Sequence, residues 1–234
     1  MIIKLFKDSN SLFMPVVKNS LLVLAVTFVG CEFLQHYYLQ IIELTRSTES
    51  SNIFAVLSQA LTSLLEFVVL TLLVPLRVME LERKAPPGNF WDFSQKHVMP
   101  LTIESIRALA ITLLWTLLLI VPGIFKYIRF FFVPYVVIAD PEYSLGKRDA
   151  LEYSNQLVKG IGFGLFIFIL GLFGLDVLRS SAREAFPLFS NPIPAVATSL
   201  LFFMLNIYTN VLLFRLYQLR VMKLSKGDQN GTHV

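Results

Sequence analysis

Six apolar stretches fill most of this 234-residue chain and leave little sequence for a soluble domain. A helix needs roughly 20 mostly apolar residues to cross a hydrocarbon core about 30 Å thick. We therefore expect an all-α integral membrane protein with six transmembrane helices. The predicted spans are residues 19–42, 53–76, 106–121, 124–139, 160–178 and 194–217.

The composition supports one membrane domain. Only 15% of the residues are charged, against about 25% in ordinary soluble domains, and the mean hydropathy is +0.66. This chain has too little polar material to cover a soluble core of its size. We expect residues 1–224 to form a single polytopic membrane domain, and the polar residues 225–234 to form a disordered cytoplasmic tail.

The positions of Lys and Arg predict the orientation, because cytoplasmic segments carry an excess of both. If the N-terminus is cytoplasmic, most of the 20 Lys and Arg residues fall in cytoplasmic segments. Arg46, Arg179 and Arg183 would then lie on the outside. We expect a bacterial inner (cytoplasmic) membrane with both termini in the cytoplasm.

Residues 144–159 have the pattern of an amphipathic helix between the fourth and fifth spans. Its apolar face comprises Ala150, Leu151, Ser154, Leu157 and Val158. We expect an interfacial helix that rests on anionic lipid, and a cap packed on the bundle is the alternative. Cations near the predicted interface are candidate contacts for lipid headgroups, at about 1 kcal/mol each. They are Arg83, Lys84, Lys147, Arg148 and Lys159.

Glu32, Glu66, Lys126 and Arg129 lie at predicted membrane depth, where a charge costs about 2.5–3.5 kcal/mol on insertion scales. We expect them to form an intramembrane charge network in which Glu32 pairs with Arg129 or Lys126. Such a pair can fix helix packing, or it can line a polar cavity for an ion, a headgroup or a solute. Glu66, near mid-membrane, is a candidate proton or cation site.

Gly160, Gly164, Gly171 and Gly174 lie roughly along one stripe of the fifth predicted span. A stripe of small residues permits close approach of two membrane helices. We therefore interpret these glycines as a helix-packing face.

The sequence carries no motif of a hydrolase, a metalloprotease or a nucleotide-binding loop. Cys31 is the single cysteine, and the three histidines are far apart, so no metal site and no cofactor are expected. The chain is predicted to be non-enzymatic.

A recognisable pattern lies within residues 122–160. It comprises Pro122-Gly123-Ile124, Arg129, Pro134, Ala150-Leu151, Ser154, Leu157 and Lys159-Gly160. The pattern resembles the YciC-like family of bacterial membrane proteins, which is related to the membrane domain of some glycerophosphodiester phosphodiesterases. The resemblance implies a six-helix inner-membrane protein. This chain has no phosphodiesterase domain, so the resemblance implies no hydrolase activity.

We expect an accessory or scaffold protein that binds membrane lipids, mainly anionic ones, and that has a protein partner or forms a homo-oligomer. No nucleic-acid partner is expected. The alternative is a small transporter or channel using Glu66 and the Glu32–Arg129 region, which would require a water-accessible cavity at those residues. A lipid-modifying enzyme is a third hypothesis, for which the sequence offers no nucleophile and base.

Overall fold

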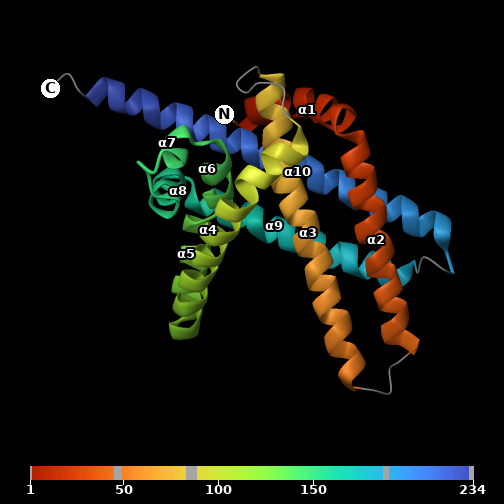
Figure 1. The fold of residues 1–234 in the computed structure, drawn as a ribbon. Helices are drawn as coiled ribbons and strands as arrows, with labels where there is room; N and C mark the ends of the chain where they lie inside the picture. The colour runs from red at the N-terminus through yellow and green to blue at the C-terminus, as the bar shows by residue number, and fades with distance from the viewer. Residues whose placement is uncertain (1, 45–48, 83–88, 187–189, 232–234) are drawn as a thin grey trace.

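The computed structural model describes residues 2–44, 49–82, 89–186 and 190–231, and every regular element in these ranges is a helix (Figure 1). The expected all-α class is therefore confirmed. The helices are α1 (Ile2–Asn19), α2 (Leu21–Leu44), α3 (Glu49–Leu81), α4 (Phe90–Leu118), α5 (Ile120–Arg129), α6 (Val133–Ala139), α7 (Pro141–Ser144), α8 (Ala150–Val158), α9 (Gly162–Ala185) and α10 (Pro192–Gly231).

Within the described residues, several helical segments are long and apolar enough to cross a membrane. They are Ala60–Leu81, Phe90–Leu118, Ile120–Ala139, Gly162–Arg183 and Pro192–Ser225. α1 and α2 meet at a bend of 82° and pass the same test only as a pair. The chain thus has five to six long apolar helices, which fits a membrane-embedded protein, and the count of six spans stays a prediction.

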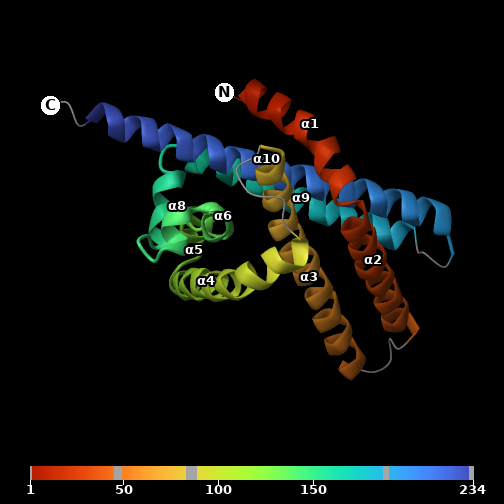
Figure 2. The same ribbon diagram turned by 45° about the horizontal axis from the view of Figure 1, so that its top comes forward.

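Two hairpins and one crossing pair make up the arrangement. α2 and α3 form one antiparallel hairpin, and α4 and α5 form the other (Figures 1 and 2). α9 and α10 run side by side in opposite directions across both hairpins (Figure 2). α9 therefore reaches from the α5 region at one end to α2 and α3 at the other.

The α4–α5 turn depends on a glycine. The helix breaks at Leu119, whereas the predicted third and fourth spans are separated at residues 122–123. Pro122 lies in the first turn of α5. Proline is tolerated there because the first helical N–H groups have no partner within the helix. A Cβ on Gly123 would lie 2.0 Å from Thr116 Oγ1, so α4 and α5 approach too closely at this point for any side chain.

The core is built on α3, α6, α8 and α10. α6 is apolar on all sides and buries Val133, Tyr135, Val136, Val137 and Ile138. Phe132, which precedes α6, packs its ring against Tyr135 and Tyr217 at centroid distances of 6.4 and 6.2 Å. This aromatic cluster joins α6 to α10.

The amphipathic helix predicted over residues 144–159 is confirmed only for α8, because residues 145–149 are not helical. The predicted position of α8, resting on lipid at the interface, is wrong. The apolar face is buried within the main hydrophobic cluster, against α5, α6 and α10. The buried residues are Ala150, Leu151, Tyr153, Ser154, Leu157 and Val158. α8 is therefore a cap packed on the bundle, and its apolar face is not free to rest on lipid.

The expected disorder from residue 225 onward is wrong for the part of the tail that the structure describes. α10 is 40 residues long and continues through Gly231. Once a helix is formed, each added residue gains one backbone hydrogen bond, so a long helix extends readily into a polar segment.

Candidate functional site

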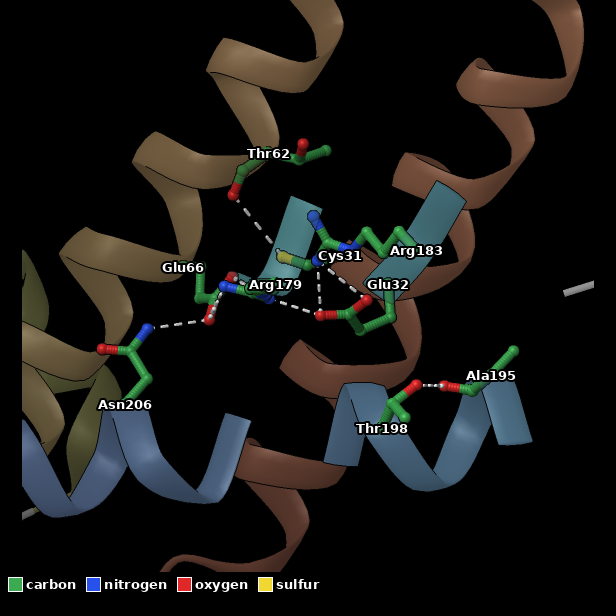
Figure 3. Close-up of polar contacts among 9 residues, drawn as sticks. All are labelled: Cys31, Glu32, Thr62, Glu66, Arg179, Arg183, Ala195, Thr198 and Asn206. Carbon is green, nitrogen blue, oxygen red and sulfur yellow. Dashed lines mark hydrogen bonds and ion pairs between the residues drawn. The ribbon is translucent and has the colours of Figure 1, made fainter. Parts of the chain in front are cut away.

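The first candidate region is a charge network between four helices. Glu32 comes from α2 and Glu66 from α3, while Arg179 and Arg183 come from α9 and Asn206 from α10. Figure 3 shows both arginines reaching toward the two carboxylates from the same helix. The spacing of four residues places both guanidinium groups on one face of α9.

Hydrogen bonds satisfy both carboxylates. Arg179 donates to Glu66 over 3.3 and 3.1 Å, and it also donates to Glu32. Arg183 donates to both oxygens of Glu32 at 2.7 and 2.9 Å. Asn206 Nδ2 donates to Glu66 Oε1 at 2.9 Å. Arg179 thus bridges the two acids and joins α2, α3 and α9.

The network is buried and balanced in charge. Glu32 is 5% exposed and Glu66 is 3% exposed, while the side chains of Arg179 and Arg183 are 13% and 10% exposed. Two carboxylates therefore face two guanidinium groups. A buried ion pair adds little net stability over an apolar replacement, but removing one partner leaves an uncompensated charge and is strongly destabilising.

A shell of weaker polar contacts surrounds the network. The Cys31 thiol lies 3.7 Å from the Thr62 carbonyl (Figure 3). Asn210 Nδ2 donates to the Asn206 carbonyl at 2.9 Å. The Nε atoms of Arg179 and Arg183 are buried and have no hydrogen-bond partner among the residues that the structure describes. Each arginine therefore binds its acids through its terminal nitrogens.

Two of the four residues predicted for the charge network belong to it. Glu32 and Glu66 do lie together, but the predicted pairing of Glu32 with Arg129 or Lys126 is wrong. Lys126 Nζ instead lies 5.2 Å from the centre of the Trp115 ring, and Arg129 ends α5 beside α8. Both belong to the region at the opposite end of α9.

The sequence predicts that Arg179 and Arg183 lie on the outside, because the apolar run ends at Leu178. α9 continues to Ala185, so Arg179 and Arg183 belong to a long helix and not to a loop. The spacing of the two arginines was the available signal. Two cations four residues apart, directly after a membrane span, can share a helix face and meet acids on other spans.

The second candidate region is a groove between α5, α8 and α9, which we call the α5–α8–α9 groove. Its volume is about 800 Å³. The wall from α5 includes Ile124, Phe125 and Ile128, and the wall from α9 includes Phe163 and Phe166. The polar side chains of its lining are Arg129, Asn155 and Lys159.

Specific backbone contacts hold the walls of this groove. Ser154, fully buried on α8, donates to the Arg129 carbonyl at 2.8 Å and accepts from the Phe132 N–H at 3.1 Å. Gly160 has φ of +82°, a left-handed conformation that glycine adopts without strain. This residue lets the chain turn from α8 into α9, and it lies in the groove lining itself.

Arg220 of α10 closes the C-terminal end of α8. Its Nε donates to the Leu157 carbonyl at 2.8 Å, and its terminal nitrogen donates to the Lys159 carbonyl. A cation at this position satisfies carbonyl groups that have no partner within a helix and neutralises the negative end of the helix dipole.

The cations predicted to contact lipid headgroups differ in whether they are available for such a contact. Arg148 binds Asp140 at 2.9 Å, pairs with Glu142 and lies 3.9 Å above the Tyr153 ring. Because these groups already neutralise it, Arg148 is not available as the free headgroup contact that the sequence predicts. Lys147 and Lys159 are exposed. Arg83 and Lys84 lie outside the described residues.

The predicted helix-packing role of the glycines is wrong. A Cβ added to Gly164, Gly171 or Gly174 would meet nothing within 4 Å, so no neighbouring helix approaches them. These residues belong to a part of α9 that is only 6% buried. Gly160 precedes α9 and serves the turn instead.

Among the described residues, no three His, Cys, Asp or Glu side chains gather as metal ligands. Fold and site together define an all-helical membrane protein with a neutralised internal charge network and an apolar groove. In comparisons with known proteins, no family model, no curated protein and no solved structure matches the chain.

Proposed function

We propose that this protein is a non-enzymatic accessory or scaffold protein that binds lipid in a bacterial inner membrane. One observation carries the proposal. Glu32 and Glu66 are neutralised by Arg179 and Arg183 of the same chain. A charge network that balances itself needs no substrate, and its direct effect is to hold helices together.

The same observation weighs against the transporter alternative. A transporter or channel needs a polar, water-accessible path to its ionisable residues. The α5–α8–α9 groove is predominantly apolar, and neither Glu32 nor Glu66 lines it. Glu66 also has Asn206 as a second hydrogen-bond donor, so its carboxylate is satisfied within the bundle.

The apolar outer surface supports lipid or partner contact. The spans within α4 and α9 are each only 6% buried, so most of their apolar side chains face outward. In a bilayer, such faces contact lipid tails or a partner membrane protein or a second copy of this chain. The Lys and Arg distribution supports the proposed placement of both termini in the cytoplasm. The resemblance to the YciC-like family supports the proposed inner-membrane location and implies no particular activity.

The proposal is tested by proton flux in liposomes. The purified full chain would be reconstituted in vesicles with a trapped pH-sensitive dye and a valinomycin-induced potassium diffusion potential. We expect proton entry equal to that of protein-free vesicles, for the wild type, for Glu66→Gln and for the exposed control Glu152→Gln. A flux that requires the protein, is lost in Glu66→Gln and persists in Glu152→Gln would overturn the proposal and establish the transporter alternative.

A further inference from the structure

We propose that the α5–α8–α9 groove binds one phospholipid with an anionic headgroup, whose phosphate contacts Arg129 and Lys159 and whose acyl chain lies along α5 and α9. This inference deepens the lipid binding of the proposed function and rests on it. It differs from general lipid contact because it assigns one site, one stoichiometry and one headgroup charge.

The size and lining of the groove are those of a ligand site. Its volume of about 800 Å³ lies within the roughly 300–1,000 Å³ that is usual for sites of small ligands. Such sites are mostly apolar with a few polar groups that orient the ligand. Here the polar groups are Arg129, Asn155 and Lys159, and the remaining side chains of the lining are apolar.

The groove is polar at one end and apolar along its length. Arg129 is the last residue of α5 and is bonded through its carbonyl to Ser154, next to Asn155 on α8. Val121, at the other end of the α5 wall, lies roughly 12 Å away along the helix axis. An amphiphile with a charged head and a hydrocarbon chain matches this gradient, whereas a free phosphate ion would leave the apolar wall unused.

Arg129 stands apart from the other arginines that the structure describes. Each of the others donates to a carboxylate or a carbonyl of the chain, namely Arg77, Arg107, Arg148, Arg179, Arg183, Arg215 and Arg220. The Arg129 guanidinium has no hydrogen bond or ion pair to any described residue, and the same holds for the Lys159 ammonium group. Arginine binds phosphate strongly through two parallel hydrogen bonds.

The local backbone adds positive potential at the same end. α9 begins at Gly162 in the groove lining, and no side chain caps its first N–H groups. Those groups carry partial positive charge and attract anions. The C-terminal end of α8 would oppose an anion, but Arg220 already satisfies its carbonyl groups. The N-terminal end of α9 therefore complements the two cationic side chains, and Arg220 offsets the unfavourable end of α8.

The test is native mass spectrometry of the full chain after exchange into bilayers of phosphatidylcholine with a minor fraction of phosphatidylglycerol. We expect the wild type to retain one phosphatidylglycerol per chain. The double variant Arg129→Gln/Lys159→Gln should retain about tenfold less, because each well-placed cation strengthens binding of an anionic lipid. The control Lys147→Gln removes an exposed cation outside the groove and should retain the lipid.

A second variant tests the apolar wall without changing charge. Ile124→Trp fills the groove from α5 and should displace the lipid, whereas Ile106→Trp on the exposed side of α4 should not. Unchanged retention in both groove variants would overturn the inference. Loss in the charge variant alone would also overturn it, because lipid would then bind by surface charge and not in the groove.

The failure of this inference can be told apart from the failure of the proposed function. Protein-dependent proton flux together with normal phosphatidylglycerol retention would contradict the scaffold and support the groove. The absence of flux together with no specific lipid on the wild type would contradict the groove and leave the scaffold in place.

Discussion

The two ends of α9 use arginine in opposite ways. Near its C-terminal end, Arg179 and Arg183 are buried and bound to Glu32 and Glu66. Near its N-terminal end, the groove presents the Arg129 guanidinium, which has no partner among the described residues. Phe166 and Arg179, which belong to the two regions, are separated by roughly 20 Å along the helix.

The difference teaches how to interpret charge in a membrane bundle. A charge that is neutralised by a fixed partner holds the fold, because separating the pair would leave a charge buried. A cation without a partner, beside an apolar groove, is free to bind an anion supplied from outside the chain. The position of a charged side chain within the membrane therefore does not by itself identify it as functional. Its hydrogen-bond and ion-pair partners must also be known.

The largest expected effect comes from breaking the charge network. Arg179→Gln leaves Glu66 with Asn206 as its one donor among the described residues. We expect this change to lower the free energy of unfolding by about 3–5 kcal/mol, as for other broken buried pairs. The measurement is equilibrium unfolding in bicelles. Arg129→Gln is the matched control and should leave stability unchanged, because no internal pair is lost. Equal losses of unfolding free energy in Arg179→Gln and Arg129→Gln would show that the two arginines do not differ in their structural role.

The next effect concerns the wall of the groove. Ser154→Ala removes the acceptor of the buried Phe132 N–H and the donor to the Arg129 carbonyl. We expect a loss of about 1–3 kcal/mol, because a buried donor is left without a partner. Ser144→Ala, at an exposed hydroxyl that donates to Pro141, should be nearly neutral in the same unfolding assay. A neutral Ser154→Ala would show that α5 and α8 are joined by other contacts.

Substituting two glycines compares a turn position, Gly160, with an exposed helix position, Gly171. Gly160→Ala should cost about 1–2 kcal/mol, since a side chain disfavours the left-handed backbone at φ of +82°. Gly171→Ala should instead be neutral or stabilising by up to about 1 kcal/mol, because alanine is the better helix former and its Cβ meets nothing within 4 Å. Thermal unfolding of both variants checks the signs. Destabilisation by Gly171→Ala would restore the helix-packing interpretation.

The smallest effect is a pH dependence at the start of α8. Burial alone would raise the pKa of Asp149, but hydrogen bonds from the Glu152 and Leu151 N–H groups and from Arg107 hold that pKa below its usual range. A lowered pKa stabilises the fold above the ordinary aspartate pKa of about 3.9, and the contribution is lost as the pH falls through the lower, folded-state value.

Asp149→Ala should therefore cost about 1 kcal/mol near neutral pH, the usual value of an N-terminal cap, and this cost should disappear in acid. Unfolding would be measured from pH 7 down to pH 3. The exposed Asp92→Ala serves as the control for the loss of an acid near a helix start and should cost less at neutral pH. A cost that persists unchanged at pH 3 would contradict the role of the carboxylate.

Local patterns predicted the local structure well. Helical spacing predicts five of the six buried residues of α8, because it determines which side chains share a face. It does not predict the break at residues 145–149 or the burial of Tyr153. Glu32 and Glu66 were identified because an acid within an apolar run stands out. The partners of Glu32 were not, because pairing depends on which helices become neighbours, and a span pattern does not determine that.

Two interpretations failed for physical reasons. The apolar run ended at Leu178, but the helix did not end there, so Arg179 and Arg183 were placed in a loop. The glycine stripe on α9 indicated a smooth face, but smoothness permits a neighbouring helix without requiring one. The first error concerns where a helix ends, which an apolar run does not determine. The second concerns a contact between elements, which the sequence of one element does not contain.

The central claim is that the intramembrane charges act as an internal pair, and a double-mutant cycle between Glu66 and Arg179 tests it most directly. Unfolding free energies would be measured in bicelles for the wild type, Glu66→Gln, Arg179→Gln and the double variant. We predict that the double variant is more stable than the sum of the single losses implies, with a coupling of about 1–3 kcal/mol. Additive losses, within about 0.5 kcal/mol, would show that the two side chains act independently and would contradict the account.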